Sequence, residues 1–147
     1  MNAFTHRLPP DPQADVADTL YLTAAERTRT RFRHQLPNGN PVHLQLSRGT
    51  VLRDGDLLRS NVGETLVRVV AKPEPVLTVT ADRPLDLLRA AYHLGNRHVE
   101  LEVHPAYLRL APDAVLRSLL TEQLHVTVTE ETAPFCPEMG AYHHAHA

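Results

Sequence analysis

The spacing of apolar and polar residues changes character near the middle of the chain. In the first half, apolar positions alternate with polar ones in short runs, the pattern of half-buried β-strands, at 19–23, 28–36, 42–46, 49–58 and 65–71. Asn38-Gly39-Asn40 accepts the positive φ of a tight turn, so 28–46 is predicted to form a hairpin. Prolines at positions 9, 10 and 12 predict an extended or irregular start. The first half is therefore predicted to be all-β.

Helical spacing appears only in the second half. Leu87, Ala91 and Leu94 form one stripe, with Pro84 in the first turn, Asp82 as the cap and Gly95 as the stop. A second helix follows Asp113, and its buried stripe consists of Leu116, Leu119, Leu120 and Leu124. Strands are predicted at 76–80, 98–104, 107–110 and 125–129. The order β-α-β-β-α-β is the ferredoxin-like plan, in which two helices cover one sheet face and the other face stays open.

A stiff connector is predicted between the halves at Lys72-Pro73-Glu74-Pro75, because two prolines in four residues keep a chain extended. Residues 1–72 contain ten basic and seven acidic side chains (+3), whereas 73–147 contain five and ten (−5). The predicted class is α+β. An all-β domain at 1–72 precedes a ferredoxin-like domain at 76–133 and a short, flexible, histidine-bearing tail at 134–147.

His98 stands at the predicted junction between helix and strand. Alternation of Val99, Leu101 and Val103 with the polar residues places His98, Glu100, Glu102 and His104 on the open sheet face. A histidine whose backbone is fixed on both sides suits a metal ligand. From spacing alone, a solvated surface histidine is the more common explanation, since one histidine is not a metal motif.

Composition directs attention to histidine chemistry. The 147 residues include ten histidines, and three of them lie in the last five positions, HHAHA. A terminus derived from cloning is the alternative explanation for these three. The single cysteine, Cys136, excludes an internal disulfide and favours a reducing compartment. No signal-peptide pattern and no apolar stretch of transmembrane length is present, so a cytoplasmic protein that does not enter membranes is expected.

Several other functions find little support. The net charge of −2 argues against a dedicated nucleic-acid binder. Four arginines, predicted to share one strand face, fit an acidic partner, phosphate or plain solvent; they are Arg27, Arg29, Arg31 and Arg33. Asp54-Gly55-Asp56 is predicted to be a turn and not a calcium loop. No nucleophile elbow or glycine-rich phosphate loop is found. An acylphosphatase-type enzyme, faintly suggested by Asn96-Arg97, and an RNA-binding module remain as alternatives.

Five segments together resemble the urease accessory nickel metallochaperones. They are GTVLRDGDLL (49–58), VRVVAKPEPVL (67–77), YHLGNRHVELEV (92–103), APFCPEMGAY (133–142) and the histidine-bearing end. The resemblance implies a protein that is not an enzyme and delivers Ni(II) for assembly of the urease active site. It also implies an N-terminal domain that binds peptides or protein partners, and a metal-binding domain that forms a homodimer. The expected partners are the urease accessory GTPase complex and apo-urease.

The same resemblance implies the metal ligands. The histidine of GNRH, here His98, is expected to take nickel at the dimer interface together with its symmetry mate, because an isologous interface repeats every residue. Nickel commonly takes about four to six ligands, so His143, His144 and His146 or water would complete the shell. Zinc and copper also suit imidazole ligands and are expected competitors. Two departures from some relatives stand out: no histidine occurs at 110–114, and the end of the chain carries three histidines where some relatives have many. Cys136 also stands where relatives often have an acidic residue.

Overall fold

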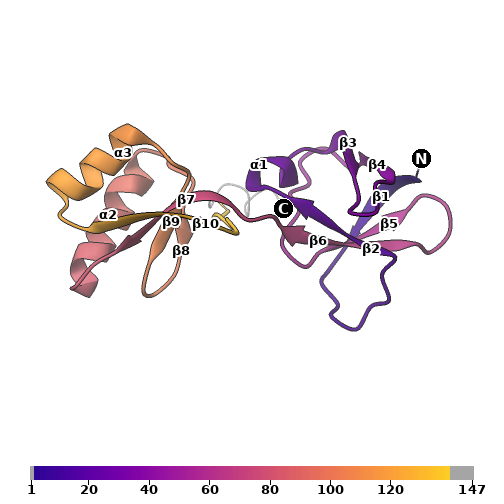
Figure 1. Ribbon diagram of the computed structural model, residues 1–147, viewed down its shortest axis with the longest axis horizontal. Helices are drawn as coiled ribbons and strands as arrows, with labels where there is room; N and C mark the ends of the chain where they lie inside the picture. The colour runs from indigo at the N-terminus through magenta and orange to yellow at the C-terminus, as the bar shows by residue number, and fades with distance from the viewer. Residues whose placement is uncertain (1, 140–147) are drawn as a thin grey trace. The chain divides into compact units, whose positions relative to one another are not determined.

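The computed structural model describes residues 2–139 and divides the chain into two compact units (Figure 1). Unit 1 comprises Met1–Lys72 and unit 2 comprises Pro73–Ala147. Each unit has its own apolar cluster, so each buries a core without help from the other. No helix within the described residues is long and apolar enough to cross a bilayer.

Unit 1 is built on one curled sheet. Its elements are β1 (Asn2–Leu8), β2 (Asp18–Leu22), α1 (Ala24–Arg27), β3 (Arg31–Gln35), β4 (Pro41–Gln45), β5 (Leu57–Ser60) and β6 (Leu66–Ala71). The strand order is β2-β6-β5-β1-β4-β3. The Nε2 atom of His34, on one edge strand, lies 3.1 Å from the carbonyl oxygen of Tyr21 on the other edge. This side chain therefore links the two edges of the sheet.

The N-terminal stretch was predicted to be extended or irregular, and it is extended: it forms a strand that the sequence pattern did not predict. Strand β1 lies inside the sheet, where it pairs in parallel with β4 and antiparallel with β5. Phe4, only 1% exposed, anchors it in the core. The prolines that suggested irregularity begin at Pro9, after the strand has ended. A proline restricts the residue before it, here Leu8, to the extended region, which is compatible with the end of a strand.

The predicted face of four arginines is also wrong, because the first arm of the hairpin begins later than expected. A reciprocal capping box at Thr23 and Glu26 starts helix α1 in place of a strand. Arg27 is consequently buried in this helix, where its Nη1 atom donates to the carbonyl oxygen of Leu22 at 2.9 Å. Of the four arginines, only Arg31 and Arg33 lie in β3, and both are exposed.

The strand predicted at 49–58 is mostly a turn. Gly55 adopts φ +92°, which reverses the chain before β5 begins at Leu57. Carboxylate oxygens of the flanking residues accept backbone hydrogen bonds: Asp54 from the amide of Ala71 and Asp56 from the amide of Arg53, both at 2.8 Å. The prediction of a turn at Asp54-Gly55-Asp56 is confirmed.

Unit 2 has two helical segments on one face of a four-stranded antiparallel sheet (Figure 1). Its elements are β7 (Glu74–Thr80), α2 (Pro84–Asn96), β8 (Glu102–Val103), β9 (Leu108–Leu110), α3 (Ala114–Ser118), the π-helical turn η1 (Leu119–Gln123) and β10 (Thr127–Ala133). The strand order is β10-β7-β9-β8. The chain is thus α+β, as predicted.

The core of unit 2 forms where the helices meet the sheet. Leu87, Ala90 and Leu94 of α2 pack with alternate strand residues such as Leu77 and Leu108. Asp113 caps α3 as predicted, its Oδ1 accepting from the amide of Leu116 at 2.9 Å. Alternate residues on the strands point away from this core, and they form the open face of the sheet.

The start of α2 differs from the prediction, which had placed Asp82 at the cap. Arg83 is the N-cap residue and makes no capping hydrogen bond. Its guanidinium instead donates a hydrogen bond to each carboxylate oxygen of Asp86, at 3.0 and 3.1 Å. This hydrogen bond is the main cause that lowers the pKa of Asp86. A carboxyl group whose pKa is lowered by folding stabilises the folded protein at pH values above its pKa in the unfolded chain. This contribution is lost as the pH falls through the lowered pKa of the folded state.

The connector between the units is shorter than predicted. Glu74 and Pro75 belong to β7, where they pair with Ala133 and Thr132 of β10. A strand can accept proline where its missing N–H breaks no ladder hydrogen bond. Only the stretch around Lys72 and Pro73 therefore remains outside the strands of both units.

These boundaries predict the behaviour of fragments. A chain of residues 73–147 should fold alone and unfold cooperatively by circular dichroism, because its core is complete. A chain of residues 76–147 should melt at a lower temperature, since it lacks the two β7 residues that pair with the end of β10. An unfolded 73–147 fragment would contradict the independence of unit 2.

Candidate functional site

His98 occupies the position at which helix α2 stops. Its φ of +57° is left-handed, a conformation that L-residues other than glycine adopt rarely. The amide of His98 donates to the carbonyl oxygen of Gly95 at 3.0 Å, and that of Val99 to Leu94 at 3.2 Å. These two bonds are those of a Schellman motif, with His98 at the place that glycine usually takes. The backbone at His98 is therefore fixed by the helix end.

Two details of the predicted junction are consequently wrong. Gly95 does not stop the helix; it lies inside α2, which continues to Asn96. His98 does not head a strand either, because β8 contains only Glu102 and Val103. The alternating apolar residues from 99 to 103 lie in a stretch of which only Glu102 and Val103 pair with another strand, β9. His98 is exposed to solvent.

A shallow hollow of about 420 Å³ adjoins His98. Two stretches of chain line it: Arg97, His98, Val99 and Glu100, and Ala111, Pro112, Asp113, Val115 and Leu116. His98 and Glu100 thus line this hollow, whereas Glu102 and His104, which were predicted to share one face with them, do not.

The solvent side of α2 carries an apolar stripe. Leu85, Leu88 and Tyr92 follow one another at i, i+3 and i+7 and are 49%, 66% and 65% exposed. Val115, which lines the hollow beside His98, is 73% exposed. Single exposed apolar residues are ordinary, but a continuous row on one helix is typical of a contact surface. The row runs along α2 towards the helix end that holds His98.

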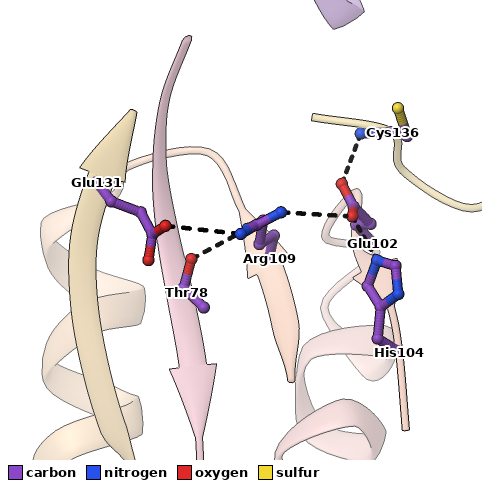
Figure 2. Close-up of polar contacts among 6 residues, drawn as sticks. All are labelled: Thr78, Glu102, His104, Arg109, Glu131 and Cys136. Carbon is purple, nitrogen blue, oxygen red and sulfur yellow. Dashed lines mark hydrogen bonds and ion pairs between the residues drawn. The ribbon is translucent and has the colours of Figure 1, made fainter. Parts of the chain in front are cut away.

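A polar row crosses the open face of the unit 2 sheet (Figure 2). Glu102 on β8 lies opposite Arg109 on β9, and Arg109 lies opposite Thr78 on β7. The Nε atom of Arg109 donates to the hydroxyl of Thr78 at 3.1 Å. Its Nη1 atom lies 3.9 Å from Glu102, and its Nη2 atom 3.6 Å from Glu131. The guanidinium is thus shared by two carboxylates.

Glu102 is the most buried acid of this row, at 7% exposure. Its Oε2 atom is hydrogen-bonded to Nε2 of His104, whose ring stacks on Tyr107 at 4.2 Å between centroids. Its Oε1 atom accepts the backbone amide of Cys136 at 2.7 Å. A buried carboxylate is tolerated only with such partners. Within residues 2–139, no buried side-chain nitrogen or oxygen lacks a hydrogen-bond partner.

The contact to Cys136 belongs to an anchored segment that follows β10. Phe135 is 3% exposed, and the amide of Glu138 donates to the carbonyl oxygen of Leu101 at 2.8 Å. The flexible tail predicted from residue 134 therefore does not begin there. We call Pro134–Glu138 the tail root, because it leads to the histidine-bearing end of the chain.

The predicted ligands divide into two groups. His98 is described, whereas His143, His144 and His146 lie outside the described residues. Within residues 2–139, no three histidine, cysteine or carboxylate side chains come together as a possible metal site. Sequence reasoning missed the roles of Arg109 and Glu131 in the open-face row. The alternation of Arg109 with Leu108 and Leu110 was an available signal, whereas Glu131 stands between polar neighbours and offered none.

Comparison with known proteins agrees with this organisation. Residues 4–72 match the family model for the N-terminal domain of the UreE urease accessory protein, and residues 74–147 match the model for its C-terminal domain. Urease accessory protein UreE of Nostoc punctiforme is 55% identical over 149 residues, covering 99% of this chain and all of that protein. The proteins of the same name from Nostoc sp. and Microcystis aeruginosa are 51% and 53% identical, each covering 99% of this chain. They are themselves covered to 99% and 95%. With both domains matched in order and relatives similar from end to end, the chain belongs to the UreE family of urease accessory proteins.

Proposed function

We propose that this protein binds Ni(II) through His98 and the histidines of its C-terminal end and delivers the ion for assembly of the urease active site. Family membership establishes a role in urease maturation, as an accessory protein and not as an enzyme. It therefore excludes the acylphosphatase-type alternative and favours urease maturation over RNA binding. The ion is cargo in this proposal, so the site must both take it and release it.

The observation that carries the proposal is the left-handed, exposed imidazole at the end of α2. Placing a residue other than glycine at this position costs of order 1 kcal/mol, which persists only where something compensates for it. A metal ligand would explain why a histidine stands where glycine would be more stable. Imidazole suits nickel, and zinc and copper are the expected competitors.

Two copies of the chain are needed, because a single histidine cannot hold an ion well. The apolar stripe on α2 supports a homodimer in which this face meets its symmetry mate. Burying Leu88 and Tyr92 against a second copy would remove apolar surface from water at about 25 cal/mol per Å². Because the stripe leads to the helix end, a two-fold axis beside it would bring two copies of His98 together.

The tail root brings further histidines within reach of His98. Leu101 lies three positions after His98, and its carbonyl oxygen accepts the amide of Glu138. That stretch spans at most about 11 Å, and the five residues from Glu138 to His143 span at most about 17 Å. The histidines beyond 142 can therefore reach an ion at His98. Partial coordination by the protein would also let the ion leave.

The strand order of unit 2 supports its description as a ferredoxin-like domain. The element order is β7-α2-β8-β9-α3-β10, and the sheet order β10-β7-β9-β8 places the first and third strands at its centre. We propose that this unit binds the metal and dimerises in the cytoplasm. Unit 1, with its exposed arginines in β3, would contact peptides or proteins of the maturation machinery, the accessory GTPase complex and apo-urease.

Replacement of His98 by glycine separates its chemical role from its backbone role. H98G should abolish the tightest nickel site in calorimetric titrations, while the free energy of unfolding stays equal or rises by roughly 0.5–1 kcal/mol. His125 provides the matched control, because it is also exposed and left-handed, with φ +54°. H125G should give the same stability change with normal nickel affinity. A tight site that survives in H98G would refute the assignment.

A charge placed in the apolar stripe tests the dimer. L88E should convert the dimer to monomers in sedimentation experiments, because a carboxylate in an apolar interface loses its hydration. It should also abolish the binding of one ion per two chains. V62E is the control, since Val62 is 69% exposed but belongs to unit 1. If L88E remains dimeric, the interface lies elsewhere.

The acidity of the solution should govern nickel affinity, because a ligating imidazole must give up its proton. An unperturbed imidazole has a pKa of about 6.5, so protons compete below that value. For two to three histidine ligands, affinity should fall by roughly two to three decades per pH unit well below pH 6. Titrations at about pH 7.5, 6 and 5 would measure this. Carboxylates stay ionised down to about pH 4, so constant affinity would indicate a carboxylate site instead.

A further inference from the structure

We propose that the free edge of β3 binds an extended acidic segment of a partner protein. The segment would pair with the strand through its main chain and with Arg31 and Arg33 through its carboxylates. This inference rests on the proposed function, in which unit 1 contacts proteins of the maturation machinery, and it names the surface and the chemistry of that contact. The surface lies in unit 1, whereas the proposed nickel ligand His98 lies in unit 2.

The stretch of chain that contains β3 is strongly basic. Positions 27–53 include six arginines and no aspartate or glutamate, although the net charge of the whole chain is −2. Arg27 is buried, whereas the other arginines of this stretch are exposed, and within residues 2–139 none of the exposed ones forms an ion pair. These exposed arginines are Arg29, Arg31, Arg33, Arg48 and Arg53. A partner that neutralises them must therefore bring negative charge.

Strand β3 lies at the edge of the unit 1 sheet, beside β4 (Figure 1). The amide of Leu46 donates to the carbonyl oxygen of Thr30, and the amide of Leu36 donates to the carbonyl oxygen of Asn40. Main-chain groups alternate in direction along an antiparallel strand. The even-numbered residues of β3 thus turn their main-chain groups towards β4, and the odd-numbered residues turn theirs towards the free edge.

The odd-numbered residues of β3 are Arg31, Arg33 and Gln35, and all three side chains are exposed. In the described part of the chain, no hydrogen bond occupies their main-chain groups. The contact that links the two edges of the sheet, from His34 to Tyr21, uses a side chain of β3 and none of these groups. The edge therefore offers N–H and C=O groups that a further strand can use.

The same two arginines provide the charge and the main-chain groups. A strand paired with them would place its residues i and i+2 directly opposite Arg31 and Arg33, with Cβ atoms about 5 Å apart. The residue between would face the side of Phe32, which is only 7% exposed. The edge therefore fits the pattern acid–apolar–acid. A second copy of β3 would instead bring arginines together, and a nucleic acid has no peptide main chain to pair.

The test compares two capped synthetic peptides of equal composition, each titrated calorimetrically into the complete chain. One peptide alternates Glu and Val, and the other repeats Glu-Glu-Val-Val, which can present a carboxylate to only one of the two arginines in any register. The second peptide should bind about five- to tenfold more weakly, because it loses an ion pair and turns a carboxylate towards Phe32. The alternating peptide should also slow hydrogen exchange of the Arg31 and Arg33 amides.

Charge reversal tests the arginines. R31E/R33E should weaken binding of the Glu-Val peptide at least about tenfold and should bind an alternating Lys-Val peptide instead. R48E/R53E is the matched control, because it reverses two exposed charges of the same basic stretch outside β3, and it should change affinity less than about twofold. Nickel affinity should stay native in both variants.

N-methylated peptides test the main-chain pairing on the native protein, so this arm does not depend on the folding of any variant. Methyl groups on the Glu amides should abolish binding, because those amides would face β3. Methyl groups on the Val amides should be tolerated, because those amides would point away from it.

The outcomes separate this inference from the nickel proposal. Equal affinity for the two Glu-Val sequences, or displacement of the peptide by single-stranded RNA at equal concentration, would show a general anion surface and overturn the inference. Binding without slower amide exchange in β3 would overturn it as well. Failure of the alternating peptide to bind, with normal nickel titrations, would refute the strand edge alone. Loss of the His98 assignment would leave the peptide result unchanged.

Discussion

The left-handed backbone of His98 is the constraint on which the arrangement of unit 2 depends. It ends α2 through the two hydrogen bonds of a Schellman motif and turns the chain towards β8. The same turn leaves the imidazole exposed and sends Leu101 and Glu102 to the positions that hold the tail root. The helix end, the exposed imidazole and the anchor of the tail root thus follow from one backbone conformation within five residues of chain.

The open face of the unit 2 sheet shows how a very short edge strand can carry a defined site. Strand β8 has only two residues and pairs with β9 alone. The side chain of Glu102 adds to this limited pairing. It contacts Arg109 and His104 and accepts a hydrogen bond from the backbone amide of Cys136. Because the carboxylate is buried, these contacts suffer little competition from water. Loss of one partner would leave a buried charge unsatisfied, so the cluster favours a single arrangement.

The two units illustrate different sources of stability. Unit 1 closes its sheet with side-chain links such as His34 to Tyr21 and with a turn whose aspartates bind backbone amides. Unit 2 depends on helices packed over alternating strand residues. The two cores share no residues.

The sequence alone determined the class of the chain, the change from strand to helix at its middle and the order β-α-β-β-α-β, because these depend on hydrophobic period and local caps. Asp113 and the Asp54-Gly55 turn were predictable for the same reason, since capping and turn preferences act within a few residues. The quoted motifs, including LGNRH, identified the family, and the comparisons confirmed it.

Only the tertiary structure decided where strands end, which residue takes the left-handed turn and what the open face does. Gly95 had the better local preference for ending the helix. However, the amide of Val99 bonds to the carbonyl oxygen of Leu94 and its side chain packs against the core of unit 2, so the helix ends at His98 instead. Strand β1 and the tail root escaped prediction because their partners lie far away in sequence, on β4, β5 and at Glu102. Local spacing reports the period of a segment; it carries no information about which distant backbone or buried charge will complete its hydrogen bonds.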